Sequence, residues 1–138
     1  MNIYHSIIPI VIYCLSGICD AIMDTLSHHF DISIFKDKNQ LFWNPSISWK
    51  NKYIDGDPKN GLVKWKILSI FVTKPVQLTD AWHFLKTIRE IFNVLAITSA
   101  GLISFNYGIL FLLGYIVVLG ITRNNAFSLF YNKLLIKK

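Results

Sequence analysis

One stretch of this sequence limits the possible folds more than any other: residues 91–122 contain no Asp, Glu, Lys or Arg. A helix needs about 20 apolar residues to cross the hydrocarbon layer of a membrane. These 32 residues are therefore too many for one crossing and slightly too few for two. Phe105 to Gly108, near the middle, suit a turn. We predict one spanning helix over about 82–104, with charged residues at its beginning, and another over about 109–122.

A further apolar segment lies at the N-terminus, over about residues 3–26, and is long enough to span. Pro9 falls near its beginning, where a proline disturbs a helix least. No Lys or Arg precedes Lys36, so the basic region of a cleaved signal peptide is missing and we expect the segment to be retained. Only 16% of the residues are charged, against roughly 25% in soluble domains. We therefore predict an all-α membrane protein, a single domain over residues 1–138 with about three transmembrane helices.

The connection over about residues 27–78 has a different character. It holds turn-forming combinations such as Asn44-Pro45 and Asn60-Gly61, and its aromatic residues alternate with lysines, as expected of a segment lying against lipid headgroups. Trp49, Lys50 and Lys52 are the candidates for binding an anionic headgroup. The alternative is a solvated loop with a few aromatic anchors. Near its end, the apolar run 67–72 is too short to span and predicts an interfacial or re-entrant piece.

Positive charges predict the orientation. The 27–78 connection holds eight lysines and the region after residue 122 holds four Lys or Arg residues, whereas the turn near residues 105–108 holds none. Cytoplasmic segments are enriched in Lys and Arg, so we predict an external N-terminus, a cytoplasmic loop and a cytoplasmic C-terminus. The basic residues flank apolar segments and form no basic helix. The net charge of +6 therefore gives no reason to expect a nucleic-acid partner.

Polar residues recur at every fourth position of the first apolar segment. On a helix they form one stripe on its cytoplasmic half. The stripe consists of Ser16, Asp20, Asp24 and His28. An Asp at the centre of a membrane helix costs about 2.5–3.5 kcal/mol even on the lower scales, so we expect both carboxylates to have partners.

The start of the second predicted span offers such partners. Packed side by side, the two groups would place carboxylates and imidazoles together, a set that suits Zn²⁺, Mn²⁺ or a di-iron pair. The candidate metal ligands are Asp20, Asp24, His28, Asp80, His83 and Glu90. No Glu-x-x-His motif accompanies them. The alternative is structural: Asp20 and Asp24 pair with Lys86, Arg89 or loop lysines and lock the helices together.

Four short motifs form a distinctive string. They are Phe42-Trp43-Asn44-Pro45, Ser48-Trp49-Lys50-Asn51-Lys52-Tyr53, Gly56-Asp57-Pro58 and Thr79-Asp80-Ala81-Trp82-His83. With the preceding residues 20–26 and His29-Phe30, they resemble a family of small, uncharacterised integral membrane proteins of bacteria and phages. The resemblance covers about residues 20–85. It implies membrane residence, with the bacterial inner membrane as the expected location, and no particular activity.

Three functions fit these features. In the leading hypothesis, the loop and a polar half-membrane pocket form one site that binds a lipid headgroup or a cation. An enzyme built on this site would use Asp20, Asp24 and His83 as ligands or general base on a lipid-linked substrate. The second is a pore-forming or membrane-disrupting effector, a homo-oligomer whose helix over 79–93 presents Lys86, Glu90 and Asn93 to a lumen. The third is a scaffold or accessory subunit. Membrane lipids are the expected partners of all three.

Overall fold

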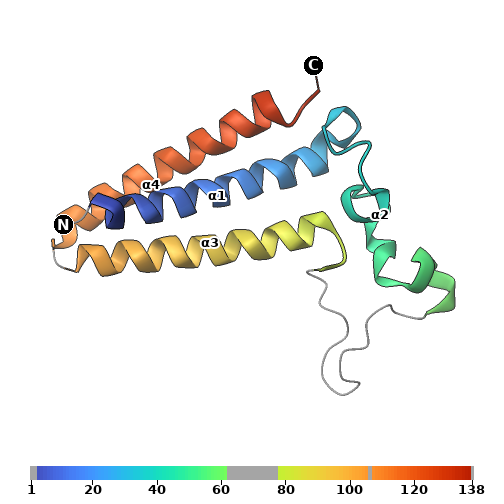
Figure 1. Cartoon of the computed structure of the whole chain (residues 1–138), viewed down its shortest axis with the longest axis horizontal. Helices are drawn as coiled ribbons and strands as arrows, with labels where there is room; N and C mark the ends of the chain where they lie inside the picture. The colour runs from blue at the N-terminus through green and yellow to red at the C-terminus, as the bar shows by residue number, and fades with distance from the viewer. Residues whose placement is uncertain (1–2, 62–77, 106, 138) are drawn as a thin grey trace.

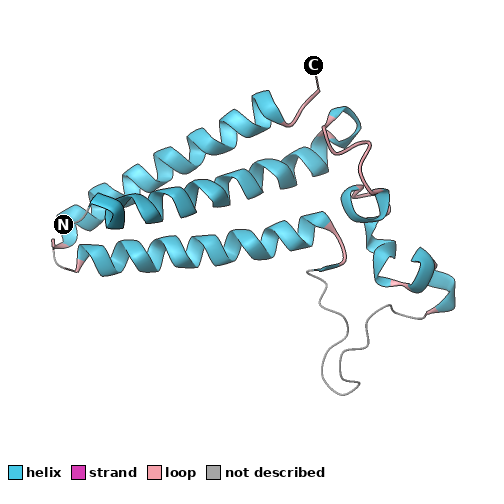
Figure 2. Cartoon of the chain, viewed as in Figure 1, coloured by secondary structure: helices cyan, strands magenta, loops and turns pink. Residues whose placement is uncertain are grey.

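The computed structural model describes residues 3–61, 78–105 and 107–137, and within these ranges the chain is helical with no strand of a sheet (Figures 1 and 2). Three long helices dominate: α1 (Ile3–His28), α3 (Ala81–Ser104) and α4 (Ile109–Leu129). α1 lies between the other two and contacts both extensively, whereas α3 and α4 touch each other little (Figure 1). Any site shared by the three helices must therefore be built around α1.

Among the described residues, two helical segments are long and apolar enough to cross a membrane, Ile7–His28 and Ile109–Leu134. α3 is of similar length but carries Lys86, Arg89 and Glu90 close together, and length and composition do not select it. Many large apolar side chains on α3 and α4 are exposed. Exposed apolar surface on this scale marks a face that contacts a membrane or another protein.

Small residues form the buried side of α3. Ala96, Ala100 and Ser104, spaced by four, are buried, whereas the larger side chains of Ile91 and Leu95 are exposed. α3 therefore packs through small residues. Small side chains let two helix backbones approach closely, which is the common arrangement where lipid can accommodate the larger side chains.

Two apolar clusters hold the ends of the helices. One contains Ala21 and Leu26 of α1, Ala81 of α3, Phe35 and Leu135, so it ties the ends of the long helices to the segments that follow them. The other, near the turn between α3 and α4, groups Ala100, Tyr115 and Leu119 with Ile10, Tyr13 and Phe111. Along α1, Ser16 and Asp20 lie between these clusters.

The connection after α1 consists of short helical turns. They are η1 (Phe30–Ile32), α2 (Gln40–Trp43), η2 (Ser48–Lys52), η3 (Ile54–Gly56) and η4 (Pro58–Asn60). Positive φ angles at Gly56 and Gly61 fall in two of the predicted turns. The apolar run 67–72, predicted as an interfacial or re-entrant piece, lies outside the described residues.

A C-terminal segment returns to the start of this connection. After α4 the chain continues as a π-helical turn, η6 (Phe130–Leu134), and then pairs with the segment that follows α1. The backbone N–H of Ile34 donates to the carbonyl of Leu135 at 2.9 Å, and that of Lys137 donates to Ile32 at 2.8 Å. Ser33 and Ile136 form an isolated antiparallel bridge. The ends of α1 and α4 are thus joined by main-chain hydrogen bonds.

Candidate functional site

The carboxylate of Asp20 on α1 binds an arginine from each of the other two long helices. It accepts a hydrogen bond from Nη1 of Arg89 on α3 at 2.9 Å, and another from Nη2 of Arg123 on α4. The three side chains are largely buried, with exposed fractions of 16% for Asp20, 23% for Arg89 and 28% for Arg123. One carboxylate therefore joins helices whose arginines lie 69 and 103 positions further along the chain.

Arg123 has further contacts on α1. Its Nε donates to the hydroxyl of Ser16 at 3.3 Å, and its guanidinium lies over the ring of Tyr13, 5.6 Å from the centroid. Ser16 is fully buried. A Cβ atom at Gly17 would lie only 2.5 Å from the carbonyl oxygen of Arg123, so the glycine permits the close approach of α4. Contacts from two turns of α1 thus fix the arginine.

Arg89 also binds the carboxylate of the next residue, Glu90, which is 55% exposed. Asn93 donates to the same carboxylate at 3.5 Å. We call Asp20, Arg89, Glu90 and Arg123 the Asp20 cluster. Its two arginines and two carboxylates have formal charges that cancel. Arg89 Nε and Asn93 Oδ1 are buried beside it and have no hydrogen-bond partner among the described residues.

The predicted metal ligands are distributed over three places. Asp20 and Glu90 belong to the Asp20 cluster, Asp24 and His28 are exposed on α1, and Asp80 and His83 lie together at the start of α3. No group of three or more His, Cys, Asp or Glu side chains in the described ranges is arranged to hold a metal ion. At Asp20, a cation would also meet two guanidinium charges. The pairing of Asp20 with Arg89 matches the structural alternative drawn from the sequence.

Asp80 and His83 form a helix cap. Asp80 is the N-cap of α3, and its Oδ1 accepts a hydrogen bond from the backbone N–H of His83 at 2.9 Å. Nδ1 of His83 lies 2.8 Å from Oδ2 of the same carboxylate, and the Thr79 hydroxyl donates to it at 3.0 Å. The three catalytic candidates therefore do not share one site: His83 contacts Asp80, Asp20 binds the arginines, and Asp24 is exposed.

The headgroup candidates lie on the short helix η2. The Nζ of Lys50 lies 5.6 Å from the centroid of the Trp49 ring, and that of Lys52 lies 5.1 Å from the centroid of Tyr53. The side chain of Asn51 donates to the carbonyl of Thr79 at 2.5 Å, which attaches η2 to the beginning of α3. The structure thus presents paired lysine and aromatic side chains beside that helix start.

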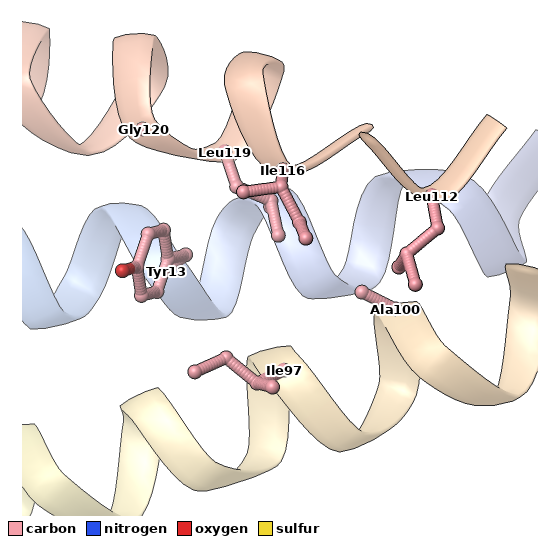
Figure 3. A pocket seen from close by; sticks show the side chains of 7 residues that line it. All are labelled: Tyr13, Ile97, Ala100, Leu112, Ile116, Leu119 and Gly120. Carbon is pink, nitrogen blue, oxygen red and sulfur yellow. The ribbon is translucent and has the colours of Figure 1, made fainter. Parts of the chain in front are cut away.

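An apolar cavity of about 240 Å³ lies between the three long helices (Figure 3). α1 contributes Tyr13, α3 contributes Ile97 and Ala100, and α4 contributes Leu112, Ile116, Leu119 and Gly120. Tyr13 connects this cavity to the Asp20 cluster, because its ring also lies beneath the guanidinium of Arg123. Since the lining comes from three separate segments, no local pattern in the sequence indicated this cavity.

Arg123 is the central residue that sequence reasoning missed. The sequence pattern counts it only among the positive residues after residue 122 that predict the orientation. The available signal was chemical: a buried carboxylate in an apolar helix needs a cation, and Arg123 is the cation nearest to the last apolar segment.

Comparison with protein-family models, with curated proteins and with solved structures gives no match for this chain.

Proposed function

We propose that the chain is a three-span integral membrane protein that acts as a membrane scaffold or accessory subunit. Ile7–His28 and Ile109–Leu134 supply two spans by length and composition, and α3 is the third because it packs along α1 and binds its charged residue. In the proposed orientation the N-terminus is outside, and the lysine-rich connection and the C-terminus are cytoplasmic.

The observation that carries this proposal is the pairing of Asp20 with two arginines from different helices. Ionisable side chains within a membrane normally face the interior of the protein and pair with one another. Here the pairing uses both carboxylate oxygens, which favours a fastening role over the binding of a cation. The cluster thus determines how the three helices are held together, and their exposed apolar sides contact lipid or a partner.

Replacing Asp20 alone tests the fastening role. Breaking a buried ion pair from one side costs about 3–5 kcal/mol, because the remaining charges stay buried without a partner. We expect Asp20→Leu to lower the unfolding midpoint strongly, measured by circular dichroism in lipid nanodiscs. The quadruple variant Asp20→Leu, Arg89→Met, Glu90→Gln, Arg123→Met should recover most of the loss, because all four charges of the Asp20 cluster are then removed together.

Asp24→Leu is the matched control, since Asp24 lies one turn away on α1, is exposed, and has no ion pair with another described residue. It should change the midpoint little. Equal midpoints for the Asp20→Leu and Asp24→Leu proteins would contradict the fastening role. So would a stoichiometric metal in the purified protein that disappears in the Asp20→Leu variant.

Binding of anionic headgroups is a second candidate function, favoured by the lysine and aromatic pairs. Besides the two pairs on η2, Lys86 lies over the ring of Trp82 in the first turns of α3, 5.2 Å from the centroid. Aromatic rings that sit at headgroup level, with lysines beside them, suit the surface of an anionic membrane.

Native mass spectrometry of protein extracted from mixed phosphatidylglycerol and phosphatidylcholine vesicles tests this function. Each lysine near the surface contributes about 1 kcal/mol, so Lys50→Gln with Lys52→Gln should weaken retention of phosphatidylglycerol more than tenfold. Lys59→Gln, an exposed lysine of η4, is the control and should have a smaller effect. Equal retention in the double variant and the control would exclude a specific headgroup site at η2.

A further inference from the structure

The apolar cavity between α1, α3 and α4 is not used by the proposed function. It has a volume of about 240 Å³, and among its lining residues only Tyr13 carries a polar side-chain group. In Figure 3 the Tyr13 hydroxyl lies at the Gly120 end of the cavity, away from Leu112. An apolar cavity of about 150 Å³ already stays dry and can bind benzene. This cavity therefore suits an apolar ligand better than water or an ion.

The open side of the cavity lies between α3 and α4. Ile97 of α3 and Ile116 of α4 both line the cavity, yet these residues are 60% and 52% exposed. α3 and α4 contact each other little, so neither helix closes this side. The proposed function makes both helices membrane spans, and their exposed surfaces then face lipid. Acyl chains are therefore the molecules that lie at the opening.

The cavity extends over the depth of one leaflet. At about 1.5 Å per residue, Leu112 lies about 4.5 Å from the start of α4 and Gly120 about 16.5 Å. On α3, Ala100 and Ile97 lie about 6 Å and about 10.5 Å from the end at Ser104, beside the same turn. Half of the hydrocarbon core is about 15 Å thick. An acyl chain of the leaflet on the side of this turn therefore has the depth and the direction of the cavity.

Two small residues create the space for such a chain. Ala100 of α3 is buried, and Gly120 of α4 has no side chain. A Cβ atom at Gly120 would meet no described atom within 4 Å. At the inner end, the ring of Tyr13 lies beneath the guanidinium of Arg123, which belongs to the Asp20 cluster. The apolar lining thus ends near the middle of the membrane, which is also where an acyl chain ends.

We propose that this cavity binds one acyl chain of a phospholipid from the leaflet on the side of the α3–α4 turn. The chain enters between α3 and α4 and packs against the side of α1 that carries Tyr13. This inference rests on the proposed function, because both α3 and α4 must span the membrane. It assigns a structural partner to the scaffold, a lipid that packs between two helices with few contacts of their own. The site is separate from the lysine and aromatic pairs of η2, which lie beside the opposite end of α3.

Filling the cavity with a side chain tests the proposal. Gly120→Leu places a side chain in the space that the acyl chain would occupy. Gly114→Leu is the matched control, because Gly114 lies on the same helix outside the lining, and a Cβ there also meets no described atom within 4 Å. The probe is palmitoyl-oleoyl-phosphatidylcholine, whose lack of net charge minimises binding to the lysines of η2. Native mass spectrometry of protein extracted from vesicles of this lipid measures retention.

The unsubstituted protein and Gly114→Leu should each retain one phospholipid molecule. Gly120→Leu should lower the retained fraction by roughly tenfold, which corresponds to losing about 1.4 kcal/mol of packing contacts. Gly120→Ala, compared with Gly114→Ala, fills less of the space, should have a smaller effect in the same direction, and serves if Gly120→Leu does not fold. Retention that does not differ within either pair would overturn the proposal.

A chain-length series shows which part of the lipid is bound. With lysophosphatidylcholines, the difference in retention between the unsubstituted protein and Gly120→Leu should grow with chain length. It should level off once the chain reaches about 12 Å, the length of α4 from Leu112 to Gly120. A difference that is constant over the series would contradict binding of the chain. Oleate added to the same vesicles tests the source, because retention of oleate without phosphatidylcholine would overturn the phospholipid.

A membrane-impermeant maleimide separates the failure of this inference from that of the proposed function. Val94→Cys, in a Cys14→Ala, Cys19→Ala background, places a thiol at an exposed position near the middle of α3. If it reacts readily in intact lipid vesicles, α3 does not span and both proposals fail together. If it is protected while the Gly120 and Gly114 variants retain phospholipid equally, α3 spans and the acyl-chain site alone is wrong.

Discussion

α3 and α4 are similar in length and each sends one arginine to Asp20, yet they pack against α1 in different ways. α3 buries small side chains and begins at a side-chain cap, Asp80. α4 buries the larger Tyr115 and Leu119, has no side-chain cap at Gly108, and approaches α1 closely at Gly17. The shared element is the ion pair, and the apolar packing around it differs between the two helices.

This difference shows which membrane helices can be recognised from amino-acid composition and which cannot. α4 is apolar on all sides, so its sequence alone marks it as able to span a membrane. α3 carries three charged residues over five positions, and its place beside α1 becomes evident only when Arg89 is seen to bind Asp20. A charged residue can therefore identify the partner of a helix even where it weakens the hydropathy signal.

The largest expected effect outside the Asp20 cluster is specific to α4. In Gly17→Ala, the new methyl group would clash with the backbone carbonyl of Arg123, which must shift. Overpacking of this kind costs about 1–3 kcal/mol. The unfolding midpoint in nanodiscs should fall, and spin labels should show α4 moving away from α1 while α3 keeps its distance.

Gly101→Ala is the control for this comparison, because a Cβ there meets no described atom within 4 Å. It should be neutral or slightly stabilising, since alanine favours a helix over glycine by about 1 kcal/mol. If Gly17→Ala displaced α3 and α4 equally, the two interfaces with α1 would not be separable as described.

A smaller effect should be specific to α3. Asp80→Ala removes the acceptor for the backbone N–H of His83, and the loss of such a cap costs about 1 kcal/mol. Hydrogen exchange should accelerate in the first turn of α3 and remain unchanged in α4. Asp80→Asn, which retains a capping oxygen, should leave exchange close to normal. Similar acceleration in both Asp80 variants would indicate a role for the carboxylate charge beyond capping.

The smallest effect concerns an ion pair between the segment that follows α4 and the connection that follows α1. Lys137 binds Asp37, and this hydrogen bond, together with the lysine charge, lowers the pKa of Asp37. A lowered pKa means that the folded state favours the carboxylate. The contribution is therefore present above the ordinary aspartate pKa and is lost as pH falls through the lowered value.

Unfolding midpoints of the native protein and Asp37→Asn, measured from neutral to acidic pH, check this prediction. The native protein should be slightly more stable at neutral pH, and the difference should vanish in acid. A difference that is constant over the whole range would contradict the ion pair. Asp31→Asn, also exposed and near the same turn, is the control and should show no such change.

The helical part of the fold could be predicted well because its signals are local. α1 and α3 begin and end within two residues of the expected limits, and the turn before Gly108 falls where it was expected. α4 was predicted to end near residue 122 but continues to Leu129. The expected end near residue 122 follows from the end of the uncharged stretch, whereas Arg123 is accommodated inside the helix because Asp20 binds its charge.

The candidate site could be predicted only in part, because its contacts join distant segments. The four-residue spacing on α1 correctly drew attention to Asp20, yet it gave equal weight to Asp24, which is exposed. Spacing gives the angle of a side chain around its own helix and not the position of the neighbouring helix. The direction from α1 to Arg123 depends on the close approach at Gly17, which no periodicity reveals.

The separation of Asp20 from its arginines along the chain also affects the order of events during synthesis and membrane insertion. A ribosome makes the chain from its N-terminus, so α1 is complete long before Arg89, 69 positions later, and Arg123, 103 positions later. In the proposed topology, a nascent α1 carries a carboxyl group without an arginine partner until α3 has been synthesised, and the second arginine arrives only with α4. Insertion must therefore keep that group in contact with water or other polar groups, and final assembly awaits the arrival of α4.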